Sequence, residues 1–87
     1  MTTYKLTVST PDGTVYDGEA VSLIVRGADG DLAVLAGHVP FVTTVMAGKC
    51  VILTDDDEYS YDIGIGLLTV EGSFAVLLTE YAKKSVE

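Results

Sequence analysis

The sequence lacks most of the residues on which small enzymes and metal proteins depend. It has one cysteine (Cys50), one histidine (His38) and no tryptophan. A single cysteine excludes a disulfide within the chain, and one histidine plus one cysteine cannot supply the several ligands of a zinc site. Neither residue has an evident sequence partner for nucleophilic or acid–base catalysis. We therefore expect no catalytic residue, no metal site, no nucleotide-binding site and no cofactor.

Basic residues are also scarce. Five Lys and Arg residues stand against 13 Asp and Glu residues, for a net charge of −8. Such a surface repels nucleic-acid phosphates and anionic lipids, and every apolar run is shorter than the ~18 residues that a transmembrane helix needs. No signal peptide pattern follows Met1. We expect a soluble cytoplasmic protein with no nucleic-acid partner, no direct membrane insertion, and a partner that carries basic loops.

Short apolar segments separated by turn residues fill the chain. Residues 4–8 alternate apolar and polar side chains, and the turn sequence Thr10, Pro11, Asp12, Gly13 follows. Such segments recur about every 8–12 residues, which is typical of a β-sandwich or barrel. The sequence predicts an all-β fold, a flattened β-sandwich of about ten short, mostly antiparallel strands. Residues 1–87 form one domain, with 80–87 as the start of a tail or helix.

Three local predictions follow from the same patterns. Residues 19–26 are interpreted as one long strand, and Ala47 and Gly48 as a turn between two strands. Gly64 and Gly66 interrupt an apolar stretch, which indicates a bulge or the close approach of another backbone. Cys50 lies in an apolar, strand-like run, and we interpret it as a buried, inert thiol.

Residues 55–58 are four consecutive acids, Asp55, Asp56, Asp57 and Glu58. They lack the alternating ligands and central glycine of a calcium-binding loop. A solvated turn that caps a hairpin and keeps a sheet edge from pairing with other sheets explains them better.

The segment from Gly27 to Phe41 holds the densest set of turn residues. It combines three glycines, the only histidine and one of two prolines. No Gly-Lys-Ser/Thr follows its glycines, and the carboxylates of Asp29 and Asp31 would repel a phosphate. Two interpretations stay open from the residues alone: a tight turn whose aspartates bond their own backbone, or a protein-contact surface.

The order of these motifs resembles the epsilon subunit of bacterial F-type ATP synthase, in its N-terminal β-sandwich domain. The resemblance spans nearly the whole chain, and its specificity lies in the ordered set rather than in any single motif. The matching motifs are residues 6–13 (LTVSTPDG), 15–19 (VYDGE), 27–32 (GADGDL), 34–35 (VL), 37–40 (GHVP), Thr43, 68–70 (LTV) and 76–78 (VLL).

The resemblance implies a non-catalytic subunit of the central stalk. In this family the domain binds the gamma subunit and rests on the polar loops of the c-ring. It thereby couples ion-driven rotation to ATP synthesis in the catalytic head. The implied location is peripheral, at the cytoplasmic face of the bacterial plasma membrane. An uncovered gamma-binding face further implies that the isolated domain self-associates.

The resemblance also assigns contact residues. Asp29, Gly30 and Asp31 would face the c-ring loops, while His38, Pro40 and Thr43 would face the gamma subunit. The charge argument agrees with the first assignment, because an acidic turn attracts a basic loop.

Some features depart from the family pattern. Ala33 and Ala36 replace a common glycine and proline, and Ile65 replaces the second of two adjacent glycines. The chain ends at Glu87, where most members continue into a C-terminal helical hairpin, so the hairpin's inhibitory role is not expected here. Because a fold does not determine function, the alternative is a stand-alone β-sandwich protein-binding module.

Overall fold

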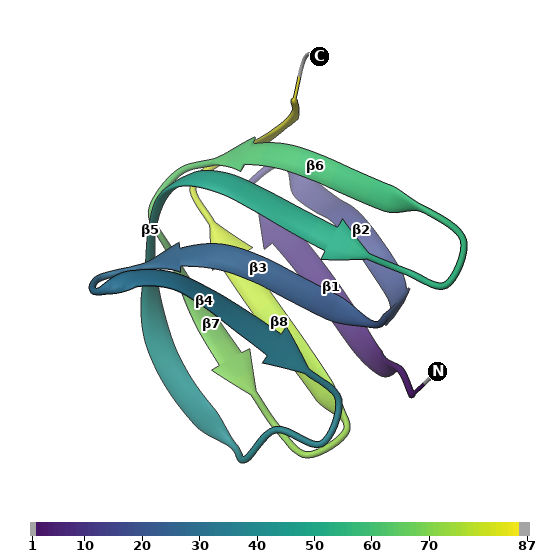
Figure 1. Cartoon of the computed structure of the whole chain (residues 1–87). Coiled ribbons are helices and arrows are strands. Elements are labelled where there is room, and N and C mark those ends of the chain that lie inside the picture. The colour runs from purple at the N-terminus through teal and green to yellow at the C-terminus, as the bar shows by residue number, and fades with distance from the viewer. Residues whose placement is uncertain (1, 86–87) are drawn as a thin grey trace.

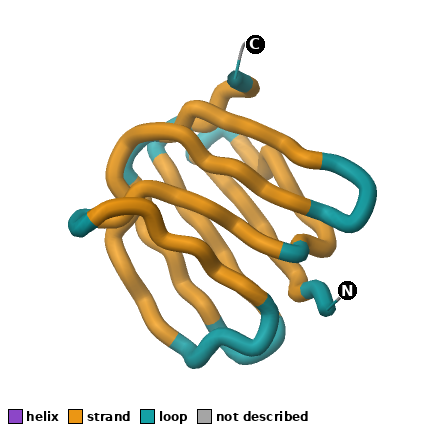
Figure 2. The backbone as a smooth tube through the Cα atoms, viewed as in Figure 1, coloured by secondary structure: helices purple, strands orange, loops and turns teal. Residues whose placement is uncertain are grey.

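The computed structural model describes residues 2–85, and nine strands make up most of this part (Figure 1). Short loops join them (Figure 2). Within residues 2–85 there is no helix of the length and apolarity needed to cross a membrane. The strands are β1 Tyr4–Thr10, β2 Gly13–Ala20, β3 Ser22–Gly27, β4 Gly30–Leu35, β5 Phe41–Leu53, β6 Glu58–Ile63, β7 Gly66–Val70, β8 Phe74–Thr79 and β9 Ala82–Lys84.

The strands form two sheets that pack face to face. Sheet A has the order β2-β1-β8-β7-β5, and sheet B has the order β4-β3-β5-β6-β9. All pairs are antiparallel except β1 with β8. The prediction of an all-β sandwich with mostly antiparallel strands is confirmed.

Strand β5 belongs to both sheets. Its first half pairs with β7, Phe41 opposite Val70, and its second half pairs with β6, Cys50 opposite Tyr61. Gly48 lies at the change of sheet with φ 155°, and the Arg26 side chain packs over it. The predicted turn at Ala47 and Gly48 is therefore wrong. The chain bends there without reversing, because a glycine inside a strand permits a sharp bend as well as a turn.

The chain changes sheet again at Val21. The predicted single strand over residues 19–26 is in fact two strands, β2 and β3, on opposite sheets. Val21 lies between them and its amide donates to the Leu53 carbonyl at 2.7 Å. Residues 82–84 also differ from the expected tail or helix. They form β9, and the Ser85 amide donates to the Ser60 carbonyl at 3.0 Å.

The core lies between the sheets and follows the two-residue period of the strands. Alternate residues of each strand point inward, and the larger apolar ones are almost fully buried. Full burial of one such side chain contributes about 1.5–3 kcal/mol. The largest fully buried side chains are Leu6, Val8, Leu23, Val25, Val34, Val45, Cys50, Ile52, Ile63, Leu68 and Leu77.

Tyrosines tie the two sheets together. The Tyr4 hydroxyl donates to the Val34 carbonyl at 2.8 Å, from β1 of sheet A to β4 of sheet B. The Tyr16 and Tyr59 rings lie 5.6 Å apart between β2 and β6. Burial raises the pKa of the Tyr4 hydroxyl well above its usual value. The hydroxyl is therefore a lasting donor across the sandwich.

Cys50 is fully buried on the inner face of β5. Burial raises the pKa of its thiol to about 12. A thiol held protonated and covered in this way is a poor nucleophile. The prediction that Cys50 is buried is confirmed.

Gly66 lies where two backbones approach closely, as the glycine pattern predicted. A Cβ at this position would overlap the Leu78 carbonyl oxygen and come within 3.2 Å of the Thr79 Cα. Both neighbouring atoms belong to the backbone of β8, so neither can rotate away. At Gly72, in the β7–β8 turn, a Cβ would meet no heavy atom within 4 Å.

We expect Gly66→Ala to destabilise the fold by about 1–3 kcal/mol, because overpacking here forces the β7 and β8 backbones apart. Gly72→Ala is the matched control and should leave stability within about 0.5 kcal/mol of the unsubstituted chain. Urea unfolding followed by circular dichroism measures both. Equal midpoints for the two variants would contradict the close approach.

Candidate functional site

The acidic turn, residues 27–31, joins β3 to β4. Gly27 and Gly30 are register partners, and Ala28 and Asp29 form the tip of the hairpin. Gly30 has φ 132°, a backbone angle that favours glycine. The hairpin ends at an outer edge of the molecule (Figure 1), and the side chains of Asp29 and Asp31 are exposed. The turn therefore presents two carboxylates to solvent.

Neither carboxylate is used inside the described structure. Asp29 and Asp31 make no side-chain hydrogen bond and no ion pair with any of residues 2–85. The other acidic turn differs, because Thr54 Oγ1 accepts from the amide of Asp57 at 2.9 Å and from that of Asp56 at 3.3 Å. The interpretation in which the aspartates bond their own backbone therefore fails, and the protein-contact surface stays a prediction.

A groove of about 260 Å³ runs beside the acidic turn. The turn itself forms one wall, and Leu32 of β4 and Thr43 of β5 complete the lining. The groove lies between β4, an edge of sheet B, and the first half of β5, an edge of sheet A. The structure thus brings Thr43 to the residues predicted to contact the c-ring, although Thr43 was assigned to the gamma subunit.

His38 and Pro40 lie elsewhere, in the β4–β5 loop at the opposite end of β4 from the acidic turn. The His38 ring is 5.5 Å from the Phe41 ring, and the β7–β8 turn residues Glu71 and Gly72 lie beside it. His38 and Pro40 thus form a second cluster at another end of the sandwich. The six predicted contact residues do not make up a single site.

The outer face of sheet A is a feature that the sequence analysis missed. Register places Thr44, Leu67, Leu78 and Ser9 in one row across four strands. Leu78 remains 51% exposed and Val42, on the same face, 62%. The sequence did carry a signal, because β7 and β8 have apolar side chains at outward-facing as well as inward-facing positions. A strand with one solvated face would alternate apolar with polar residues. We call Val42, Leu67, Phe74, Val76 and Leu78 the apolar face.

The described chain has no cluster of metal-binding side chains. Within residues 2–85 no three His, Cys, Asp or Glu side chains come together in an arrangement that could hold a metal ion.

Comparison with known proteins gives the family. The model of the ATP synthase delta/epsilon chain β-sandwich domain matches residues 3–85. The chain belongs to this family. The ATP synthase epsilon chain of Chlorobium limicola is 37% identical over 78 residues, which are 88% of this chain and 89% of that protein. The sodium-ion-specific epsilon chain of Propionigenium modestum is 34% identical over 82 residues, which are 94% of this chain and 60% of that protein.

Solved structures share the epsilon-type fold. A chain in the mitochondrial ATP synthase of Euglena gracilis superimposes with a TM-score of 0.90 at 20% identity, over 98% of this chain and 56% of that one. A chain in the Tetrahymena thermophila mitochondrial ATP synthase gives 0.78 at 9% identity, over 91% and 64%. At such identities the likeness concerns the fold alone. This chain thus spans less than two thirds of the length of both solved chains and of the Propionigenium relative. It spans most of the length of the Chlorobium relative.

Because the carboxylates of Asp29 and Asp31 have no partner in the described chain, we expect Asp29→Asn with Asp31→Asn to change stability by less than about 0.5 kcal/mol. Thr54→Ala is the contrasting variant in the other acidic turn, where lost hydrogen bonds should cost about 1 kcal/mol. Urea unfolding measures both. A large loss of stability in the double variant would restore the self-bonded interpretation.

Proposed function

We propose that this chain is a central-stalk subunit of an F-type ATP synthase. It binds the gamma subunit and the c-ring and couples ion-driven rotation to ATP synthesis in the catalytic head. Family membership over residues 3–85 supports this role, as do fold neighbours described with a c-ring and, in one case, a central stalk. The observation that carries it is an exposed pair of carboxylates, without partners in residues 2–85, at the motif the family places against the c-ring.

The acidic turn is the proposed c-ring contact. Asp29 and Asp31 meet basic side chains of the c-ring loops, with Gly30 between them. Thr43 lines the adjoining groove and is reached from the same side. Opposite charges across such a contact speed docking and fix its register, whereas like charges there cost several kcal/mol. A rotor needs this register, because torque passes only through a contact that does not slip.

The gamma subunit is the proposed partner of the apolar face and of the neighbouring β4–β5 loop. His38 and Pro40 lie beside Phe41, the first residue of β5, and Val42 of the same strand opens onto the apolar face. Exposed apolar areas of this kind mark protein contacts. A face left uncovered in the isolated chain also favours self-association.

The role is mechanical, and the chain itself performs no step of ATP chemistry. The homologues are subunits of ATP synthase, a membrane-associated complex. We place this chain at the cytoplasmic face of the bacterial plasma membrane, held there by its partners. Family membership favours this role over a stand-alone binding module.

Co-purification tests the proposal directly. The tagged 87-residue chain, expressed together with the gamma subunit of its own organism, should retain that subunit through washing and size-exclusion chromatography. An unrelated β-sandwich domain with the same tag serves as the control. If the tagged chain retains no gamma subunit, the stalk assignment fails and the stand-alone module gains support.

We expect Asp29→Lys with Asp31→Lys to uncouple the enzyme, because like charges then face the basic c-ring loops. The measurement is ATP synthesis at a fixed ion-motive force, divided by ATP hydrolysis, in vesicles that contain the whole complex. The ratio should fall by about tenfold or more, since several kcal/mol of repulsion weakens the contact at least that much. Asp55→Lys with Asp57→Lys makes the same charge change in the β5–β6 turn. An equal loss in this control would contradict the assignment of the acidic turn.

A further inference from the structure

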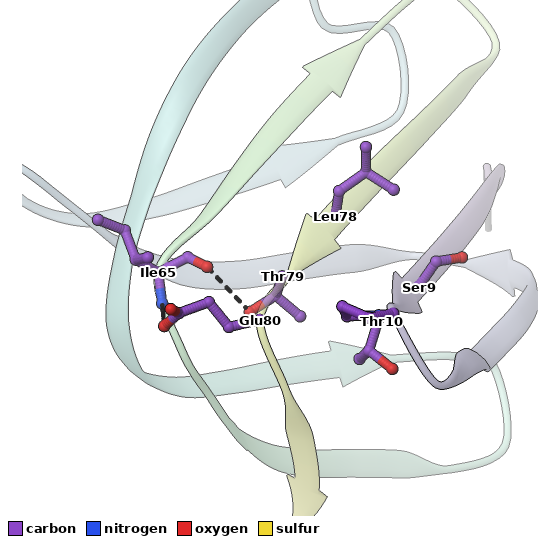
Figure 3. Close-up of a pocket in the computed structure, with 7 residues that line it drawn as sticks. Ser9, Thr10, Ile65, Leu78, Thr79 and Glu80 are labelled. Atoms are coloured by element: carbon purple, nitrogen blue, oxygen red, sulfur yellow. Dashed lines mark hydrogen bonds between the residues drawn. The ribbon is translucent and has the colours of Figure 1, made fainter.

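A second groove, of about 390 Å³, opens at the end of sheet A where β1 and β8 finish (Figure 3). The proposed c-ring contact does not use it, and the proposed gamma contact shares only Leu78 with it. It borders the apolar face, since Leu78 belongs to both and pairs with Leu67 of that face. Its lining residues are Ser9, Thr10, Pro11, Ile65, Leu78, Thr79 and Glu80.

The floor and one wall of the groove are apolar. Leu78 is 51% exposed and Ile65 46%, so both offer aliphatic surface that nothing in the described chain covers. The hydroxyl-bearing residues Ser9 and Thr10 lie across from Ile65 (Figure 3), and Pro11 also lines the groove. A long aliphatic chain would find contact on both sides.

Hydrogen bonds hold the walls in place. Thr79 Oγ1 donates to the Gly64 carbonyl at 2.9 Å, and the Glu80 amide donates to the Ile65 carbonyl at 3.2 Å. These bonds clamp the β6–β7 loop onto the end of β8. The groove therefore exists before any partner arrives, which lowers the entropic cost of binding.

Glu80 supplies the only carboxylate among the groove's lining residues. Its Oε1 accepts one hydrogen bond, from the Ile65 amide at 3.3 Å, and it makes no ion pair with any of residues 2–85. A carboxylate can accept about four hydrogen bonds. Most of its acceptor capacity thus remains available at the edge of an apolar groove.

We propose that this groove receives a lysine or arginine side chain of the gamma subunit. Its aliphatic stem lies on Leu78 and Ile65, and its cationic head reaches the Glu80 carboxylate. Long basic side chains bury their stems on apolar surface while the charged end stays at the edge. The inference rests on the proposed function and adds a charged anchor to its apolar interface.

Other occupants fit the groove less well. A phosphate or another carboxylate would be repelled by Glu80. A purely apolar side chain would bury the carboxylate without compensating its charge, which is costly. A second copy of this chain would also carry a net charge of −8. Repulsion between two such chains favours a basic partner over a second copy.

The test compares Glu80→Gln with Glu58→Gln. Both variants remove one negative charge from an exposed glutamate, and Glu58 lies in β6, which belongs to neither proposed contact. A glutamine at position 80 still accepts from the Ile65 amide. Binding to the purified gamma subunit is measured by titration calorimetry at low and high salt. Circular dichroism and urea unfolding of both variants check that the fold is intact.

We expect Glu80→Gln to weaken binding by about tenfold at low salt, the scale of a good charged contact at an interface. Its affinity should also depend less on salt than that of the unsubstituted chain, whereas Glu58→Gln should match the unsubstituted chain in both respects. Equal affinities for the two variants would overturn the groove assignment and leave the proposed function intact. If light scattering shows a dimer that only Glu80→Gln disrupts, the groove belongs to a second copy and the assignment is also overturned.

If the unsubstituted chain does not bind the gamma subunit at all, the proposed function fails and the groove assignment fails with it. The two failures are therefore distinguishable.

Discussion

The sharing of β5 between the two sheets is the constraint on which the rest of the structure depends. Its first half sets the register of β7 and its second half sets that of β3 and β6. A slip of one residue in β5 would turn the inward-facing side chains of β5 outward in both sheets. Gly48 favours this sharing, because its φ of 155° at the bend is an angle that residues with side chains rarely adopt.

Because β5 links the sheets at one side, the sandwich is open where β4 lies beside the first half of β5. Thr43 therefore comes close to the acidic turn even though twelve positions separate it from Asp31 in sequence. The same geometry sends His38 to the far end of β4, next to the β7–β8 turn. The proposed contact residues thus divide between a charged end and an apolar side, which suits the proposed binding of two different partners at once.

Much of this architecture could be predicted from the sequence, because strand period and turn chemistry are local signals. The acids at 55–58 do cap a hairpin, and Gly66 does lie against another backbone, since in both cases the residue type reflects a local need. The predictions failed where tertiary contacts, rather than local sequence, determine the structure. A glycine such as Gly48 is compatible with a turn and with a bend inside a strand. Only the pairing of β5 with both sheets shows which of the two is formed. Residues 82–84 form a strand because β6 offers an edge, although their composition suits a helix.

The candidate site likewise combines features that are local in sequence with features that only the tertiary fold brings together. The acidic turn could be found because its glycines and aspartates are adjacent in sequence. The apolar face could not be assembled in advance, since its residues come from three strands whose order across the sheet is not contained in any short segment. The groove at Glu80 is even harder to predict from the sequence, because it combines the end of β1 with the end of β8.

The parallel pair of β1 and β8 has a consequence for how the molecule is made. Lys5 lies opposite Phe74, so β1 meets its central neighbour only after the chain as far as β8 has been synthesised. The dominance of such distant pairings places folding of sheet A in the slower, millisecond-to-second class. Until β8 pairs with them, the edges of β1 and β7 are exposed together with apolar side chains, and such edges favour aggregation.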